Sequence, residues 1–271
     1  SIHSASGHSM LLSKVGRSLV PASSDPDTVL AMVRAGMNLA RVNMSHGTRD
    51  DHRKSMEAVR SAALESRLPV AILVDLAGPK IRVGELEEPI ALEESAEVVM
   101  APEDDAESCE IPITYEPLAS EIEVGDVVLL AAGLLDLRCT GTVGDRTVLE
   151  VARGGLLKSR KGINLPTVAA KAPPLTEKDL SDLDFAIEQG VEYVGLSFVR
   201  RPEDVINLKE RTRGQALVVA KIERVQALHA IEDILAQTDA VMVARGDLGV
   251  ELPFEQVPLA CLLYTSDAAD E

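Results

Sequence analysis

The stretch ALVVAKIERVQALHAIEDILAQTDAVMVARGDLG, residues 216–249, decides the fold class. Its two apolar segments, residues 216–223 and 239–245, are short and partly β-branched, which is typical of strands that are covered on both faces. The sequence between them favours a helix within residues 224–237. Strand, helix and strand in this order predict a parallel βα unit.

The same alternation continues outward from this stretch. Asp25 is a plausible N-cap followed by Pro26, and Gly36 follows the expected end of that helix. Thr176 and Asp179 form a possible capping pair for a later helix that runs to Gln189. Further helices are expected within residues 48–66 and 202–212, and further strands at LARVNMS (39–45), PVAILVD (69–75) and VEYVGLSF (191–198). This rhythm fits a (β/α)₈ barrel or a doubly wound sheet, and periodicity alone does not choose between them.

Residues 85–168 differ in character, with alternating segments such as GDVVLL and RTVLEVA that predict half-buried strands. They are predicted to be an inserted all-β domain, a lid, between residues 1–84 and 169–260 of the α/β fold. The segment CLLYTSDAADE (261–271) resembles a translated sequencing adapter and is expected to be an artefactual tail.

The composition excludes several classes of protein. The chain has 271 residues with 27 Lys plus Arg and 44 Asp plus Glu, a net charge of −17, which argues against a generic nucleic-acid binder. No apolar run approaches the roughly 20 residues of a membrane helix. The cysteines, Cys109, Cys139 and Cys261, show no C-x-x-C pairing, so we expect neither a disulfide framework nor a zinc site. This use of cysteine fits a reducing cytoplasm, so a cytoplasmic location is expected.

Polar side chains follow the apolar strands, where sites of α/β folds gather. Lys221 and Glu223 lie two residues apart on one strand and so point to the same side. Asp247 can join them from the next strand end, and two such carboxylates hold Mg²⁺ or Mn²⁺ in many proteins. Arg41, Arg82 and Lys221 offer positive charge for a phosphate. These residues predict metal-assisted phosphoryl or carboxylate chemistry.

Plainer interpretations stand beside this one. Lys221 and Glu223 could form an ordinary surface salt bridge, although the apolar residues before them favour burial. Asp75 could merely cap a turn, and GDLG (246–249) could be only a tight turn.

Six collinear segments resemble the pyruvate kinase family: MNLARVNMSHG (37–47), VDLAGPKIRVG (74–84), SRKGINLP (159–166), LTEKDLSDLDFAIEQGVEYVGLSFVR (175–200), VAKIE (219–223) and MVARGDLGVELP (242–253). The resemblance implies a (β/α)₈ TIM-type barrel, incomplete here with about six strands, and an inserted β lid. It also implies Mg²⁺-dependent phosphoryl transfer from phosphoenolpyruvate to ADP, which gives pyruvate and ATP.

The resemblance assigns roles to particular residues. Lys221 is expected to neutralise charge on the phosphoryl group and the enolate, Arg41 to bind the phosphate, and Glu223 with Asp247 to bind Mg²⁺. The backbone N–H groups of Gly246 and Asp247 would receive the substrate carboxylate. Arg82 and Lys161 would face the nucleotide. The positions that match the family's monovalent-cation site are Asn43, Ser45, Asp75 and the carbonyl of Leu76.

This chain departs from the family pattern at several points. Lys80 stands in GPKIR where K⁺-dependent members usually read GPEIR, so a reduced or absent dependence on K⁺ is expected. Val20 replaces an expected glycine, and Ala131 with Ala132 replace acidic residues of the lid. The last barrel strands and the C-terminal domain are missing, so we expect this chain alone to be poorly soluble and inactive.

The full-length parent is expected to be a homotetramer that binds no nucleic acid and no membrane. Two alternatives remain open: a Mg²⁺-dependent aldolase or lyase that forms pyruvate-type enolates on a related barrel, and a non-catalytic fragment.

Overall fold

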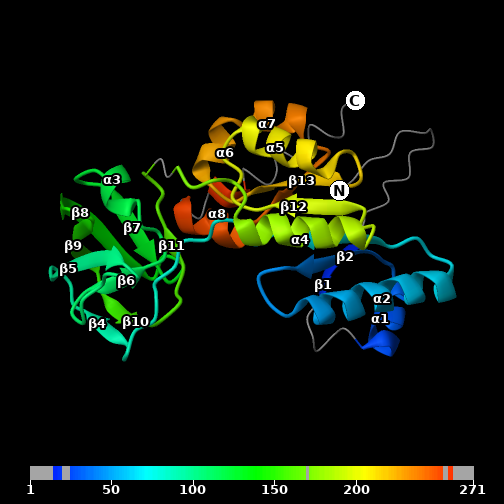
Figure 1. Ribbon diagram of the computed structural model, residues 1–271, viewed down its shortest axis with the longest axis horizontal. Coiled ribbons are helices and arrows are strands. Elements are labelled where there is room, and N and C mark those ends of the chain that lie inside the picture. Colours follow the sequence, from blue (N-terminus) through cyan, green and yellow to red (C-terminus); the bar gives the residue numbers. More distant parts are fainter. Residues whose placement is uncertain (1–14, 20–24, 169–170, 253–255, 259–271) are drawn as a thin grey trace. The chain divides into compact units, whose positions relative to one another are not determined.

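The computed structural model describes residues 15–19, 25–168, 171–252 and 256–258. Val20 and the expected tail at 261–271 lie outside these residues. The chain forms two compact units, which are described separately (Figure 1). Of the described residues, the first unit contains 15–19, 25–78 and 174–244, and the second contains 79–168, 171–173, 245–252 and 256–258.

The first unit is built on one parallel sheet of six strands in the order β1-β2-β3-β12-β13-β14. The strands are β1 (Val15–Leu19), β2 (Met37–Asn43), β3 (Ala71–Asp75), β12 (Tyr193–Leu196), β13 (Leu217–Ile222) and β14 (Ala240–Val243). Their spatial order follows the chain order, whereas a doubly wound sheet reverses direction at a switch point. The sheet is therefore part of an α/β barrel, and the alternative of a doubly wound sheet is wrong.

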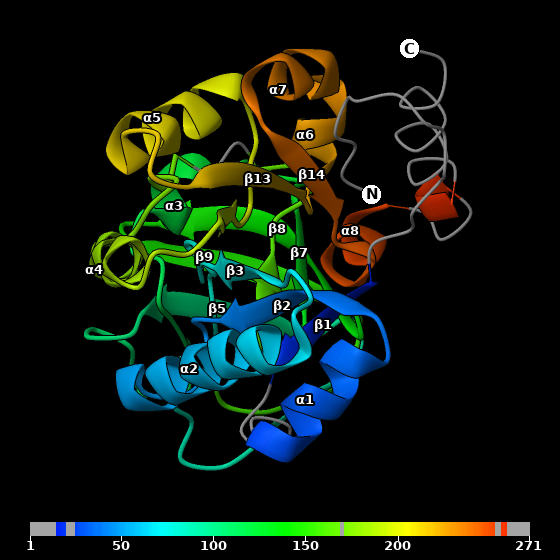
Figure 2. The same ribbon diagram turned by 90° about the vertical axis from the view of Figure 1, so that its right-hand side faces the viewer.

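Helices connect the strands and lie along one side of the sheet (Figure 2). They are α1 (Pro26–Arg34), α2 (Arg49–Ser66), α4 (Glu177–Glu188), α5 (Pro202–Thr212), α6 (Val225–His229) and α7 (Ile231–Gln237). The Asp25 cap of α1 is confirmed, because its side chain accepts the backbone N–H of Thr28. The capping pair of α4 is confirmed as a reciprocal box between Thr176 and Asp179.

One helix prediction needs correction. The single helix expected within residues 224–237 is two helices, α6 and α7, which meet at Ala230. The backbone of Ala230, with φ −112° and ψ 21°, leaves the helical region and ends α6.

The core of the first unit is almost wholly aliphatic. Val29, Val59, Ile72, Val194 and Val218 are among its fully buried side chains. They come from both helices and strands, so the helices cover the apolar strands as a barrel requires. In the part of the chain that the structure describes, no helix is both long and apolar enough to cross a bilayer.

The second unit contains a six-stranded sheet in the order β11-β7-β8-β9-β5-β6 and the separate pair β10-β4. All its strand pairs are antiparallel except β5 with β6, and its core includes Leu130, Leu137 and Leu149. The elements are β4 (Ile90–Leu92), β5 (Glu97–Pro102), β6 (Ile111–Ile113), α3 (Leu118–Glu121), β7 (Val127–Leu130), β8 (Leu135–Val143), β9 (Arg146–Arg153), β10 (Gly155–Leu157), β11 (Ile163–Asn164) and α8 (Arg245–Glu251).

Candidate active site

A buried carboxylate, Asp75, stands at the end of β3. Its oxygen Oδ2 accepts Nε of Arg41 at 2.7 Å and also binds Nη2 of the same guanidinium. Arg41 comes from the neighbouring strand β2, and its Nη1 donates to Ser18 Oγ at 2.8 Å. The side chain of Arg41 is 29% exposed and that of Asp75 only 2%. Asp75 is therefore an ion-pair partner in the site, and its interpretation as a turn cap is wrong.

Lys221 of β13 meets two carboxylates and a hydroxyl. Its Nζ lies 3.0 Å from Asp75 Oδ1, 2.9 Å from Glu223 Oε1 and 2.7 Å from Ser197 Oγ. The side chains of Lys221 and Glu223 are 9% and 2% exposed. The alternative of a surface salt bridge is therefore wrong. Two cations, Arg41 and Lys221, balance the two carboxylates, as burial of charge requires.

The turn that follows β12 contacts this group of charges. Phe198 has a left-handed backbone, with φ 56°, and its N–H donates to Glu223 Oε2 at 2.8 Å. The guanidinium of Arg224 lies over the Phe198 ring, 5.2 Å from its centroid. Gly78 packs against this turn, where a Cβ would lie 2.9 Å from both Ser197 Cβ and Phe198 Cδ2. A glycine at position 78 is thus required by space as well as by its φ of +69°.

The four positions matched to a monovalent cation lie at the ends of β2 and β3. Asn43 Oδ1 accepts the backbone N–H of Ser45 at 3.0 Å. The carbonyl of Leu76 accepts Ser197 Oγ–H at 2.6 Å, and Asp75 carries the ion pairs given above. Asn43 is the register partner of Asp75 on the neighbouring strand.

The second unit has a hollow of about 660 Å³ with a strongly cationic lining. Its positive residues are Lys80, Arg82, Lys158, Arg160 and Lys161. Gly246 and Asp247 also line it, so five of the predicted site residues of this unit share one hollow. Among the described residues of that lining, Asp247 is the single acid.

Lys80 and Asp247 approach each other across this hollow. Lys80 Nζ lies 3.5 Å from Asp247 Oδ1, and the two side chains are 37% and 36% exposed. Gly246 and Asp247 lie in the first turn of α8, so the interpretation of GDLG as only a tight turn is wrong. Glu223, in contrast, belongs to the first unit.

Two further features shape the cationic hollow. Arg160 donates from Nε to Glu85 Oε1 at 2.7 Å, and this hydrogen bond raises the pKa of the guanidinium above its usual value. Ala131 and Ala132 both have left-handed backbones, with φ 51° and 58°. Ala131 N–H donates to Gly162 O at 3.1 Å, which holds this turn against the lining.

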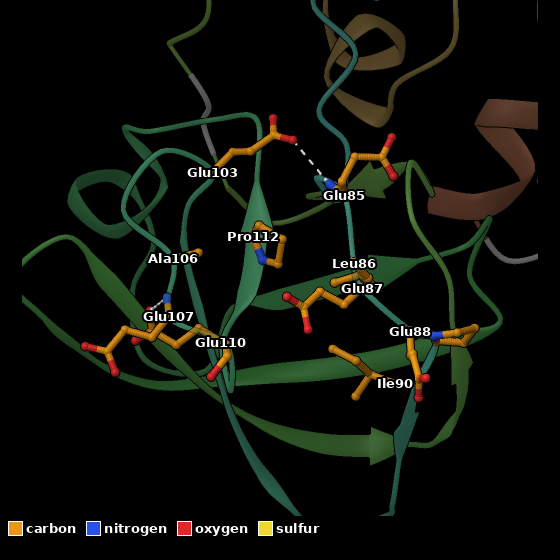
Figure 3. Close-up of a pocket in the computed structure, with 12 residues that line it drawn as sticks. Glu85, Leu86, Glu87, Glu88, Ile90, Glu103, Ala106, Glu107, Glu110 and Pro112 are labelled. Atoms are coloured by element: carbon orange, nitrogen blue, oxygen red, sulfur yellow. Dashed lines mark hydrogen bonds between the residues drawn. The ribbon is translucent and has the colours of Figure 1, made fainter.

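A second hollow of the same unit, about 650 Å³, has the opposite charge. Figure 3 shows its glutamates, with Glu85 and Glu103 near one another and Glu107 beside Glu110. Glu103 accepts the backbone N–H of Glu85, and Glu110 pairs with Arg146. Because acids repel phosphate, an anionic substrate favours the cationic hollow.

Sequence reasoning missed Ser197 and Phe198 in the first unit, and Lys158 with Arg160 in the second. Ser197 directly follows β12, so the rule that polar residues at strand ends form the site would have found it. No comparable signal marks Lys158 and Arg160, which stand in a loop.

The donor atoms of Glu223 and Asp247 suit Mg²⁺, which takes oxygen ligands and one or two carboxylates per site. Each Glu223 oxygen has one hydrogen-bonding partner among the contacts above, and a carboxylate oxygen has two lone pairs. Within the described residues, no group of three His, Cys, Asp or Glu side chains could hold a metal.

Comparison with known proteins identifies the family. A family model described as "Pyruvate kinase, barrel domain" matches residues 12–267. The match runs past residue 260, so the boundary of the expected tail stays a prediction. The pyruvate kinase of Corynebacterium efficiens is 41% identical over 251 residues, which cover 91% of this chain and 53% of that protein.

Two other relatives support the same assignment. The pyruvate kinase of Mycobacterium tuberculosis H37Rv is 43% identical, with 91% of this chain and 53% of that protein covered. The pyruvate kinase of Geobacillus stearothermophilus is 39% identical, with 91% and 43% covered. The chain spans about half the length of the curated relatives it matches. With its sequential parallel sheet and its buried Lys221–Glu223 pair, the chain belongs to the pyruvate kinase family.

Proposed function

We propose that the protein transfers the phosphoryl group of phosphoenolpyruvate to ADP and produces pyruvate and ATP. The observation that carries this proposal is the buried network of Arg41, Asp75, Lys221 and Glu223 at the strand ends, in a chain of the pyruvate kinase family.

In this reaction an oxygen of the ADP β-phosphate attacks the phosphorus of phosphoenolpyruvate, and the bond between that phosphorus and the enol oxygen breaks. The enolate of pyruvate that leaves then takes a proton at its methylene carbon. Arg41, whose side chain is 29% exposed, binds the transferring phosphate. Lys221 faces the negative charge that develops on the phosphoryl group and the enolate oxygen. A fixed ammonium in a site with little water stabilises such charge strongly, because it needs no reorganisation during the reaction.

Asp75 and Glu223 hold Lys221 in place by their ion pairs. Glu223 and Asp247 would hold Mg²⁺ or Mn²⁺, and the ion would supply positive charge that offsets the negative charge of the substrates. In the second unit, Arg82 and Lys161 bind the nucleotide phosphates within the cationic hollow. The N–H groups of Gly246 and Asp247 receive the substrate carboxylate.

The test is pyruvate formation by the full-length protein from phosphoenolpyruvate, with ADP and Mg²⁺ present or omitted. Lys221→Met should lower kcat by about 10³-fold or more, because it removes the main positive charge from the transition state. Lys209→Met is the matched control, since Lys209 makes only a partly exposed ion pair with Asp239 at 2.8 Å. Pyruvate formation from an aldol substrate without ADP would favour the lyase instead.

The proposal includes a reduced or absent dependence on K⁺, because Lys80 supplies an ammonium where K⁺-dependent members of the family have a glutamate. The test compares activity in K⁺ and in tetramethylammonium salts. The parent should keep most of its activity in the tetramethylammonium salt, and Lys80→Glu should need K⁺. A parent that loses most activity without K⁺ contradicts this part of the proposal. A cytoplasmic location and a homotetramer complete the proposal, and gel filtration of the full-length protein tests the latter.

A further inference from the structure

Ser197 is a residue that the proposed reaction does not yet use. Its side chain is buried with 2% exposure and lies beside Lys221. An ammonium has three N–H donors, and the Nζ of Lys221 has three acceptors within 3.0 Å: Ser197 Oγ, Glu223 Oε1 and Asp75 Oδ1. Ser197 is the nearest of the three and the single uncharged one. It therefore orients the ammonium without reducing its positive charge.

The hydroxyl of Ser197 is itself fixed in direction. It donates to the carbonyl of Leu76 at 2.6 Å, while Asp75 Oδ1 is more distant at 3.4 Å. Leu76 is joined to β12 through its N–H, which donates to Gly195 O at 3.1 Å. The oxygen lone pairs of Ser197 consequently face Lys221, and the chain of contacts runs from β3 through β12 to β13.

The next residue holds the partner of Lys221. The N–H of Phe198 donates to Glu223 Oε2, and the turn packs so closely on Gly78 that a Cβ there would lie 2.9 Å from Ser197 Cβ and Phe198 Cδ2. One turn thus contacts both members of the pair, through a hydroxyl and through a backbone N–H. Left-handed backbone at a residue with a large side chain is costly, and it persists where surrounding contacts determine it.

We propose that Ser197 is a positioning residue for Lys221, and that the Ser197–Phe198 turn sets the place of the ammonium relative to Glu223. The inference rests on the proposed function for its catalytic consequence, but the fixing of the ammonium is a property of the free protein. A small displacement of a charged group away from the developing charge lowers the reaction rate strongly.

The first experiment measures kcat and both KM values for the full-length protein and three Ser197 variants. Ser197→Ala should lower kcat by about 10- to 100-fold and change KM for ADP by less than about 2-fold, because the cationic hollow is untouched. Ser197→Thr keeps the hydroxyl and should recover most of kcat. Ser197→Cys keeps the shape with a weak acceptor, should fall between them, and decides the matter where the alanine variant does not fold.

Ser55→Ala is the matched control. Ser55 is another buried serine whose hydroxyl donates to a backbone carbonyl, that of Asp51 at 2.9 Å, and its loss should leave kcat within about 2-fold. A kcat loss of equal size in the Ser197 and Ser55 variants would show a general structural effect and overturn the inference.

The second experiment needs no metal, substrate or activity. In ¹⁵N-lysine-labelled protein without Mg²⁺, an ammonium held by three acceptors exchanges its protons slowly and gives a visible Nζ signal, which Lys221→Met identifies by its absence. The signal should vanish in Ser197→Ala and remain in Ser197→Thr. A signal that persists in the alanine variant, or an unchanged kcat there, overturns the positioning role. A parent that forms no pyruvate contradicts the proposed function alone, and the Nζ signal then tests the positioning role separately.

Discussion

The charged groups of the two units differ in burial and in pairing. In the first unit, Asp75 and Lys221 are nearly fully buried, and each charge of the group formed by Arg41, Asp75, Lys221 and Glu223 has a close partner. In the second unit, Lys80 and Asp247 are each more than a third exposed and lie 3.5 Å apart, and further cations surround them. Buried charges without partners are costly, whereas exposed charges keep their water. The first region is suited to fixed catalytic groups, and the second to binding an anion.

The largest expected effect comes from neutralising one carboxylate in each region. Asp75→Asn should destabilise the first unit by about 3–5 kcal/mol, because it leaves Arg41 and Lys221 short of a buried partner. Asp247→Asn should change stability by less than about 1 kcal/mol, because its ion pair is exposed. Urea unfolding followed by circular dichroism measures both, since the chain has no Trp. Equal losses would contradict the comparison.

A smaller difference is expected for two glycines, one in each region. Gly78→Ala should cost about 2–4 kcal/mol, because a positive φ and a Cβ only 2.9 Å from Ser197 and Phe198 both oppose it. Gly162→Ala would place a Cβ 3.3 Å from Lys80 Cε, a movable side-chain atom, and should cost less than about 1 kcal/mol. Thermal unfolding of both variants tests the order, and a Gly78 variant as stable as the parent would show that the turn is adaptable.

The smallest effect concerns salt. Raising tetramethylammonium chloride from about 0.05 to 0.5 M should weaken ADP binding several-fold, because the exposed cations of the hollow are screened. The stability difference between the parent and Asp75→Asn should change little, because buried pairs are screened much less. Calorimetric titration and unfolding measured in the same buffers compare the two responses. A salt-independent ADP affinity would mean that the cations of the hollow do not bind the phosphates.

Much of the first unit could be predicted because its signals are local. Asp25, Thr176 and Asp179 cap helices through atoms within three residues, so their roles follow from the sequence alone. The proximity of Lys221, on β13, and Glu223, directly after the end of β13, likewise follows from their spacing of two residues. The break at Ala230 was missed, because the helical pattern of the surrounding residues continues through it.

The sequence by itself determined the alternation of strands and helices, the all-β character of GDVVLL and RTVLEVA, and the residue types available at the strand ends. Only the tertiary structure decided which of those residues meet. Asp75 reaches Lys221 across β12, through the register that pairs Gly195 with Asp75 and Leu196 with Ala220. Along the chain, all the strands of the second unit lie between β3 and β12, so no local spacing connects Asp75 with Lys221. Strand order and register are set by the burial of the complete apolar sheet, and they bring Ser197 beside an ammonium to which no sequence pattern assigned it.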